Sequence, residues 1–153
     1  AYHETKWEEL RLAPGAARLL ADLNAAGVRL GVISAGLTRK QMEKILRLGM
    51  DRYVEPQLIL ITDQVGVAKS NPLLYRMAVE LAGVPAERTM HVGDHPQKDA
   101  DGAKRAGMQV AWHRGTGKYS QIQPELEPDH IIDSLEELRP IFIERYGLAL
   151  PPR

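Results

Sequence analysis

Two carboxylates stand close together in the segment His91-Val92-Gly93-Asp94-His95-Pro96-Gln97-Lys98-Asp99. The apolar run 89–92 predicts a strand that ends just before Asp94, and Asp99 follows five positions later, where a predicted helix begins. Two carboxylates in one strand-to-helix turn concentrate negative charge and attract a cation. The cation is most often Mg²⁺, which binds carboxylate and water oxygens. The segment therefore predicts a metal site at Asp94 and Asp99, and it indicates phosphoryl chemistry.

A hydroxyl group and an ammonium group stand at comparable places elsewhere in the chain. Ser34 directly follows the apolar run 28–33, and Lys69 precedes the helix that comes after the next apolar run. In parallel α/β sheets, ligands bind at the carboxyl ends of the strands. We therefore expect Ser34, Lys69 and Asp94 to lie at one edge of a common sheet.

Short apolar strands alternate with amphipathic helices along the chain. The predicted strands are 28–33, 57–62, 89–92, 108–113 and 130–132. The predicted helices begin at Pro14, Thr38, Pro72 and Lys98 and after Ser134. This alternation predicts an α/β fold, a Rossmann-like parallel sheet with helices on both faces.

Side chains that could cap helices support three of these starts. Thr38 with Gln41, and Ser134 with Glu137, have the spacing of a capping box. Asn71 directly precedes a proline, so it is expected to cap the helix that begins at residue 72.

Composition narrows the class of protein. The 153 residues fit one domain, which we place at 1–147 and follow with a tail at 148–153. The 20 basic and 20 acidic side chains balance, so nothing indicates nucleic-acid binding. There is no cysteine and no apolar run of membrane-spanning length, so we expect a cytoplasmic protein without disulfides or membrane contact.

Three segments, in this order, resemble the second, third and fourth motifs of the haloacid-dehalogenase-like (HAD) hydrolases. They are Gly31-Val32-Ile33-Ser34-Ala35-Gly36, Gly66-Val67-Ala68-Lys69-Ser70-Asn71-Pro72, and Gly93-Asp94 through Asp99 with the following residues 101–108. The resemblance extends from about residue 12 to about residue 137, which is most of the chain.

The resemblance implies a Mg²⁺-dependent phosphatase that acts on a small phosphorylated substrate through an aspartyl-phosphate. Ser34 and Lys69 would be catalytic residues, and Ser34, Ala35, Gly36 and Lys69 would bind the phosphate. Asp94 would hold the metal ion, with Asp99 completing or orienting that site.

The chain departs from the family pattern at several of these positions. Ala35 stands where the family often has asparagine, which removes one side-chain donor to phosphate. Asn71 replaces an aspartate and is expected to cap its helix equally well. His95 stands where serine or threonine is frequent and places a titratable group beside the metal site.

The largest departure concerns the nucleophile. The family uses the first aspartate of an Asp-x-Asp pair that closes an apolar strand ahead of the Ser34 motif, and this chain has no such pair there. Asp99-Ala100-Asp101 lies within the fourth motif, and Asp63 has Val65 two positions later, so neither fits. The missing strand would be the central first strand, between 28–33 and 89–92. We therefore expect these residues to be the C-terminal part of a hydrolase core, without its cap, and to be inactive alone.

Other functions remain open. The chain could be a non-catalytic phosphate- or metal-binding module, or one subunit of a split enzyme. A response-regulator receiver is a third alternative, but it needs an acidic pair after its first strand, and residues 28–36 contain none. Uncovered strand edges would favour homodimer formation or strand exchange.

The sequence also suggests ordinary structural roles for several polar residues. We interpret Asp101 as a solvent-facing helix charge and His91 as a core or edge histidine whose hydrogen bonds are satisfied. The glycine-rich loop with Arg114, Lys118 and Tyr119 is expected to be a mobile surface loop.

Overall fold

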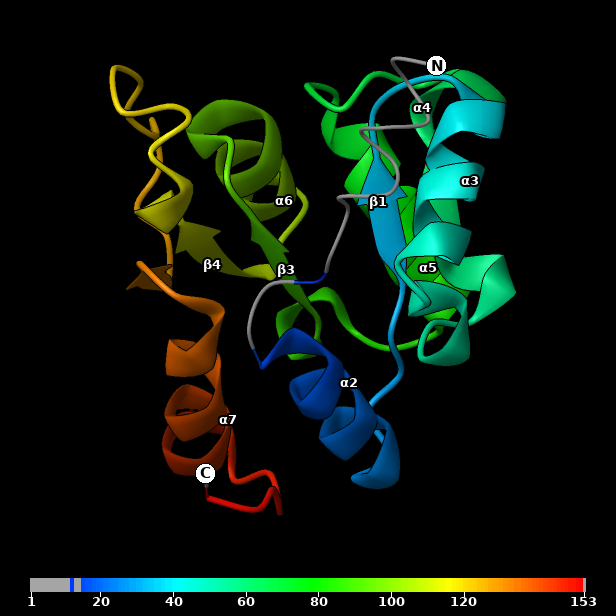
Figure 1. The fold of residues 1–153 in the computed structure, drawn as a ribbon. Helices are drawn as coiled ribbons and strands as arrows, with labels where there is room; N and C mark the ends of the chain where they lie inside the picture. Colours follow the sequence, from blue (N-terminus) through cyan, green and yellow to red (C-terminus); the bar gives the residue numbers. More distant parts are fainter. Residues whose placement is uncertain (1–11, 13–14, 153) are drawn as a thin grey trace.

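The structure is a computed structural model, and it describes residue 12 and residues 15–152. The strands form two parallel sheets, and helices pack against them (Figure 1). The predicted helix start at Pro14 lies outside the described residues. The strands are β1 (Val32–Ser34), β2 (Ile59–Ile61), β3 (Met90–Gly93), β4 (Gln109–His113) and β5 (His130–Ile132). The α-helices are α2 (Ala16–Ala25), α3 (Thr38–Arg47), α4 (Thr62–Val65), α5 (Pro72–Ala82), α6 (Gly102–Arg105) and α7 (Leu138–Tyr146).

Short helical turns connect these elements. Five are 3₁₀ turns: η1 (Met50–Arg52), η2 (Pro56–Leu58), η3 (Ala86–Arg88), η5 (Arg114–Thr116) and η6 (Leu135–Glu137). The sixth, η4 (Pro96–Asp101), is a π-helical turn. Within the described ranges, no helix combines the length and the apolar character that a membrane crossing would need.

The strands form two parallel sheets. β1 pairs with β2, with Ile33 opposite Leu60. β3, β4 and β5 form the other sheet in that order, with His91 opposite Val110. β1 and β3 are therefore edge strands within the described part of the chain. The predicted missing strand was expected between these same two strands.

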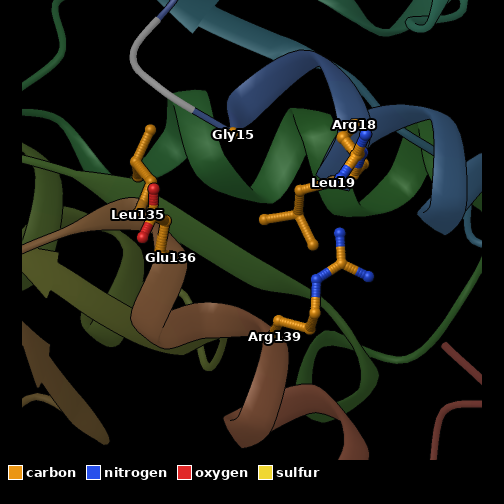
Figure 2. Close-up of a pocket in the computed structure, with 6 residues that line it drawn as sticks. All are labelled: Gly15, Arg18, Leu19, Leu135, Glu136 and Arg139. Atoms are coloured by element: carbon orange, nitrogen blue, oxygen red, sulfur yellow. The ribbon is translucent and has the colours of Figure 1, made fainter. Parts of the chain in front are cut away.

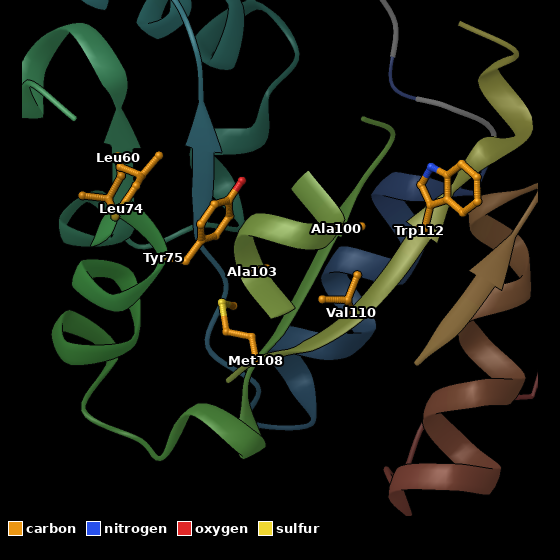
Figure 3. Close-up of a cluster of buried hydrophobic side chains, with 8 residues drawn as sticks. All are labelled: Leu60, Leu74, Tyr75, Ala100, Ala103, Met108, Val110 and Trp112. Carbon is orange, nitrogen blue, oxygen red and sulfur yellow. The ribbon is translucent and has the colours of Figure 1, made fainter. Parts of the chain in front are cut away.

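Successive side chains of β4 point to opposite faces of the sheet, and the apolar ones among them require helices on both faces. Val110 and Trp112 point to one face, where they pack in a cluster with side chains of β2, α5, η4 and α6 (Figure 3). Ala111, between them, points to the other face and packs with α2 and α7. Figure 1 shows α2 and α7 side by side at the bottom of the view. The predicted α/β fold with helices on both faces is confirmed.

The start of α3 differs from the prediction. Thr38 is the first helical residue, the cap position is Leu37, and no side chain of the helix caps its own backbone. The Asp63 carboxylate does so from α4: it accepts hydrogen bonds from the Thr38 backbone N–H at 3.1 Å and from the Thr38 hydroxyl at 2.8 Å. The Thr38–Gln41 capping box is therefore wrong, because a carboxylate from a neighbouring element already satisfies the helix start.

The other two helix starts are as predicted. Ser134 and Glu137 form a capping box ahead of α7. The Asn71 side chain accepts a hydrogen bond from the Leu73 backbone N–H at 3.0 Å, and α5 ends at Gly83 in a left-handed conformation.

Replacing Asn71 with alanine should destabilise the chain by about 1 kcal/mol, because the first turn of α5 loses its side-chain acceptor. Denaturant unfolding of the two proteins measures the difference. Asn71→Asp keeps an acceptor in place and serves as the matched control. Equal losses in both variants would contradict the assigned cap.

Several predicted boundaries are also changed. The strand predicted at 57–62 is paired only over Ile59–Ile61, and the helix predicted from Lys98 begins as the π-helical turn at Pro96. The strand predicted at 28–33 is paired only from Val32. Gly31 lies so close to the end of η2 that an added Cβ would be 2.6 Å from the Leu58 carbonyl oxygen. Residues 148–152 have no regular structure, but Leu150 is buried against α7 and its neighbours.

Candidate functional site

The predicted site residues come from two strand ends, from the connection before α5 and from the turn η4. Ser34 is the last residue of β1, and Asp94 follows Gly93, the last residue of β3. Lys69 lies in the connection just before α5, and Asp99 lies in η4. The site is therefore built at strand ends and on the turns that follow them, as expected for this sheet type.

Asp99 is the centre of a buried polar cluster. Its side chain is 2% exposed, and its Oδ1 lies 2.6 Å from Lys69 Nζ. His91 Nε2 is 3.0 Å from the same oxygen, and the His95 backbone N–H donates to Oδ2 at 3.0 Å. Because a carboxylate only accepts, His91 carries its proton on Nε2 in this contact. Both oxygens of Asp99 are thus used by groups of the chain.

The local backbone brings this cluster together. Residues Asp99 and Ala100 both donate their backbone N–H to the carbonyl of His95, which gives η4 its wide π-helical turn. Gly93 allows the close approach of Asp99, since an added Cβ would lie 2.4 Å from Asp99 Cγ. π-helical turns are rare and often occur at functional sites.

Tyr75 supports the cluster from α5. It is fully buried, and its hydroxyl donates to the Lys98 carbonyl at 2.5 Å. Its ring meets the His91 ring edge-on with 5.0 Å between centroids. Burial, and then the charge of Asp99, raise the pKa of the Tyr75 hydroxyl, so it stays protonated and donates.

Opposing effects act on the pKa of the Asp99 carboxyl. Burial raises the pKa of Asp99, but the hydrogen bond and charge of His91 and the charge of Lys69 outweigh burial. The pKa of the Asp99 carboxyl therefore lies well below its ordinary range, and Asp99 is ionised at neutral pH.

This shift gives a pH dependence of stability. A carboxyl whose pKa is lower in the folded than in the unfolded state stabilises the fold above about pH 4, and that contribution is lost as the pH falls further. We expect the wild-type chain to lose more unfolding free energy between pH 7 and pH 3 than Asp99→Asn does. Urea unfolding across this range measures both. Identical pH dependences would contradict the ionised, paired state of Asp99.

Asp94 is placed differently. Among the described residues, none makes a hydrogen bond or ion pair with its side chain, and Asp94 lines a cavity of about 390 Å³. Its backbone carbonyl accepts a hydrogen bond from Trp112 Nε1 at 3.0 Å. Asp94 is thus held in place through its backbone while its carboxylate remains available.

The donor set can be compared with the needs of Mg²⁺. No group of three or more His, Cys, Asp or Glu side chains in the described part of the chain is placed to hold a metal ion. Mg²⁺ is often held by one or two carboxylates, with waters and substrate phosphate completing the shell. Asp94 fits as one such ligand, whereas the contacts of Asp99 suit a residue that orients the site.

His95 lies between these two carboxylates in the sequence. Its Nδ1 accepts hydrogen bonds from the backbone N–H groups of Gln97 at 3.2 Å and Lys98 at 3.0 Å, so it caps η4. Burial and then Lys98 hold the pKa of His95 below its ordinary value, although Asp99 and Asp94 act in the opposite direction. The ring is therefore neutral at pH 7, with its proton on Nε2.

The predicted phosphate-binding residues at the end of β1 have partners within the protein. The Ser34 hydroxyl donates to Gln41 Oε1 at 2.8 Å, and the Gly36 backbone N–H donates to the Thr62 hydroxyl at 3.1 Å. Ala35 and Gly36 are exposed. The structure brings Lys69 to Asp99, while Ser34 contacts neither of them.

Two residues of this region were not assigned to the site from the sequence. His91 has the satisfied hydrogen bond that we predicted, but its partner is Asp99, so it belongs to the polar cluster. The prediction for Asp101 is wrong: it is fully buried and accepts hydrogen bonds from the backbone N–H groups of Glu125 and Leu126. Strand alternation was the available signal for His91, since it places this side chain on the face of β3 that Tyr75 covers.

A second cavity lies away from these residues. Its volume is about 200 Å³, and it lies between α2 and the η6–α7 segment (Figure 2). It is lined by Gly15, Arg18, Leu19, Leu135, Glu136 and Arg139, none of which is a predicted site residue. The candidate site is therefore the one around Asp94 and Asp99.

Known proteins are similar to this chain in both sequence and fold. The glyceraldehyde 3-phosphate phosphatase of Methanopyrus kandleri is 38% identical over 141 residues, which are 90% of this chain and 59% of that protein. The phosphoserine phosphatase of Thermus thermophilus is 36% identical over 128 residues, 83% of this chain and 49% of that protein. A crystal structure of a HAD phosphatase from Thermococcus onnurineus superposes with a TM-score of 0.78 at 27% identity, covering 91% of this chain and 61% of that one.

The chain thus spans about half to three fifths of the length of these relatives. The model of one family, described as haloacid dehalogenase-like hydrolase, matches residues 1–107. That match includes all of the predicted site residues, from Ser34 to Asp99. The chain belongs to the haloacid dehalogenase-like hydrolases.

Proposed function

We propose that this chain is part of a Mg²⁺-dependent phosphatase that cleaves a small phosphate ester through an aspartyl-phosphate. The observation that carries the proposal is the 2.6 Å contact between Lys69 Nζ and the buried carboxylate of Asp99, one π-helical turn from the available carboxylate of Asp94. This arrangement holds the Lys69 ammonium group at a buried carboxylate that lies five positions along the chain from Asp94, the residue that we propose as the metal ligand. The phosphatase names of the relatives support the same chemistry.

Lys69 and Ser34 have separate roles in this proposal. The Lys69 ammonium group, oriented by Asp99, offsets negative charge on the nucleophile and on the phosphoryl group in transfer. Ser34, with the backbone of Ala35 and Gly36, binds phosphoryl oxygens at the start of α3. Substrate binding there requires Ser34 and Gly36 to exchange Gln41 and Thr62 for phosphate oxygens.

Asp94 would hold the Mg²⁺ ion, and Asp99 would orient the site without ligating the ion. When bound, Mg²⁺ would neutralise charge between the ester and the nucleophile. His91 and the His95 backbone keep Asp99 in one orientation, because each donates to one of its two oxygens.

The nucleophile and the acid–base residue belong, in this proposal, to a strand that carries the family's Asp-x-Asp pair and lies between β1 and β3. Among the residues that the structure describes, β1 and β3 each leave one edge unpaired, which supports that position. In its absence, pairing with a second copy or strand exchange would cover the edges. We propose that residues 1–147 belong to the core domain, that residues 148–153 form a short tail, and that the protein is cytoplasmic.

The test compares two samples with p-nitrophenyl phosphate and Mg²⁺. One is this chain alone, and the other is the completed protein, which we define as this chain together with the strand segment that carries the Asp-x-Asp pair. We expect turnover only by the completed protein, and we expect EDTA to abolish it. Turnover by the purified chain alone would overturn the assignment of the nucleophile.

Absence of turnover by the completed protein would have a different meaning. If it bound Mg²⁺ or phosphate without turnover, the chain would be a non-catalytic binding module. If activity appeared only when the two parts were mixed as separate chains from the native source, the chain would be a subunit of a split enzyme.

A further inference from the structure

The side-chain amide of Gln41 lies against the predicted phosphate-binding segment, Ser34 to Gly36. Gln41 is near the start of α3, which Figure 1 shows beside β1. The Ser34 hydroxyl donates a hydrogen bond to Gln41 Oε1 at 2.8 Å. Because Oε1 is the acceptor, the other amide atom, Nε2, keeps two N–H groups for further partners. Among the described residues, none accepts a hydrogen bond from Nε2.

The glycine at position 36 lets this amide approach the backbone of the segment. An added Cβ at Gly36 would lie 2.7 Å from Gln41 Nε2 and 3.3 Å from Gln41 Cδ. The φ angle of Gly36 is 137°, a conformation that favours glycine. Since Nε2 and Oε1 are bonded to the same carbon, Nε2 is close to the Ser34 hydroxyl as well. A phosphoryl oxygen held by Ser34 and the Gly36 backbone would therefore lie next to Nε2.

The Ser34–Gly36 segment itself offers phosphate few side-chain donors. Residue 35 is alanine, so the Ser34 hydroxyl is the one side-chain donor within these three residues. This hydroxyl has a single hydrogen, which must leave Gln41 if it is to reach a phosphoryl oxygen. The exchange leaves the Gln41 amide beside the phosphoryl group. Gln41 is partly exposed, so water can replace Ser34 as the donor to Oε1.

The charges at this end of α3 suit an anion. The Asp63 carboxylate accepts hydrogen bonds from the backbone N–H and the hydroxyl of Thr38, and these hold the pKa of Asp63 below its ordinary value, so it is ionised. Two exposed cations, Arg39 and Lys40, follow in the first turn of the helix, which contains no acidic residue. The cations outnumber the carboxylate, and the helix start adds partial positive charge.

We propose that the Gln41 side-chain amide is a phosphate-binding group, and that Nε2 donates a hydrogen bond to the phosphoryl group bound by Ser34 and the Gly36 backbone. The inference rests on the proposed phosphatase function and adds a residue to its phosphate-binding set. Without substrate, Gln41 orients the Ser34 hydroxyl through Oε1. With substrate, it contributes the side-chain donor that Ala35 does not provide.

The test measures competitive inhibition of the completed protein by inorganic phosphate, with p-nitrophenyl phosphate as the substrate. Gln41→Met keeps an unbranched side chain that suits a helix and removes the amide. We expect the inhibition constant for phosphate and KM for the substrate both to rise about tenfold, because a hydrogen bond to a charged group is lost. The change in kcat should be smaller, because the contact is made both before and during phosphoryl transfer.

Gln57→Met is the matched control. Gln57 is exposed in η2, ahead of the amino end of β2, and its Nε2 donates to Glu55. The control variant makes the same change of side chain away from the Ser34–Gly36 segment, so it should leave the inhibition constant and KM unchanged.

A second variant separates a donor to phosphate from a group that only orients Ser34. Gln41→Glu keeps an acceptor for the Ser34 hydroxyl, but it has no donor and adds a negative charge. We expect Gln41→Glu to bind phosphate more weakly than Gln41→Met does. Tighter binding by Gln41→Glu than by Gln41→Met would overturn the inference, since Gln41 would then act only through Ser34. Thermal unfolding of both variants checks that folded proteins are compared.

The same assay distinguishes failure of this inference from failure of the proposed function. If the unmodified completed protein hydrolyses p-nitrophenyl phosphate, and phosphate inhibits Gln41→Met equally well, this inference alone is overturned. If the unmodified completed protein hydrolyses no phosphate ester, the proposed function is overturned, and this inference with it.

Discussion

Replacing Lys69 with methionine should lower kcat of the completed protein by about 10²- to 10³-fold, the loss that follows removal of one preorganised charge at a reacting centre. Methionine keeps an unbranched stem of similar length and removes only the ammonium group that lies 2.6 Å from Asp99. Steady-state kinetics with p-nitrophenyl phosphate at saturating Mg²⁺ measures the effect. KM should change less than kcat, because the charge acts mainly on the transition state.

Lys44→Met controls for the loss of a positive charge. Lys44 lies on an exposed face of α3, away from the Asp99 cluster, and its replacement should leave kcat unchanged. Thermal unfolding of the Lys69 variant should accompany the kinetics, so that a folded sample is compared. A folded Lys69→Met protein with wild-type kcat would remove Lys69 from the catalytic site.

Adding a single methyl group at Gly93 should both destabilise the chain and inactivate the completed protein. The new Cβ would lie 2.4 Å from Asp99 Cγ and 2.6 Å from Asp99 Cβ, so Asp99 must move away from Lys69 and His91. Overpacking of this kind costs about 2 kcal/mol. Urea unfolding of Gly93→Ala measures the stability, and kcat of the completed protein measures the displacement of Asp99.

A double-mutant cycle with Asp99→Gly separates the clash from other effects of the alanine. If the clash is the cause, Gly93→Ala should cost much less stability in the Asp99→Gly background, because all three nearest atoms have gone. Equal costs in the two backgrounds would show that the alanine acts on something other than Asp99.

The layers of the fold could be predicted well from the sequence, because apolar runs and helix starts are local patterns. Strands β4 and β5 and the start of α5 lie within a residue or so of their predicted places, since apolar runs and an Asn-Pro helix start specify them directly. The capping box at Thr38 failed for the opposite reason. Asp63, 25 residues away in the chain, supplies the acceptor, and such a partner cannot be seen in local spacing.

The candidate site was predictable in its residue types and less so in its contacts. The Lys69 and Asp99 segments were both singled out, and the structure joins them. The burial of Asp101 was missed because its partners are backbone N–H groups of an irregular segment with no sequence pattern. The contacts of Asp99 with His91 and with the His95 backbone could not be seen in the sequence, because only the fold brings these groups close.

Residues 123–129, which belong to the connection between β4 and β5, are held in place by η4 and α6. This anchoring limits the lengths that the connection can tolerate. Insertions in surface loops are usually accepted because no specific partner is lost. Here the backbone of Glu125 and Leu126 must stay in register with Asp101, and Asp129 must stay in register with both Lys104 and the Val110 backbone N–H. Homologous chains should therefore vary in length around Gly117, at the exposed tip, and keep a constant number of residues from Gln123 to β5.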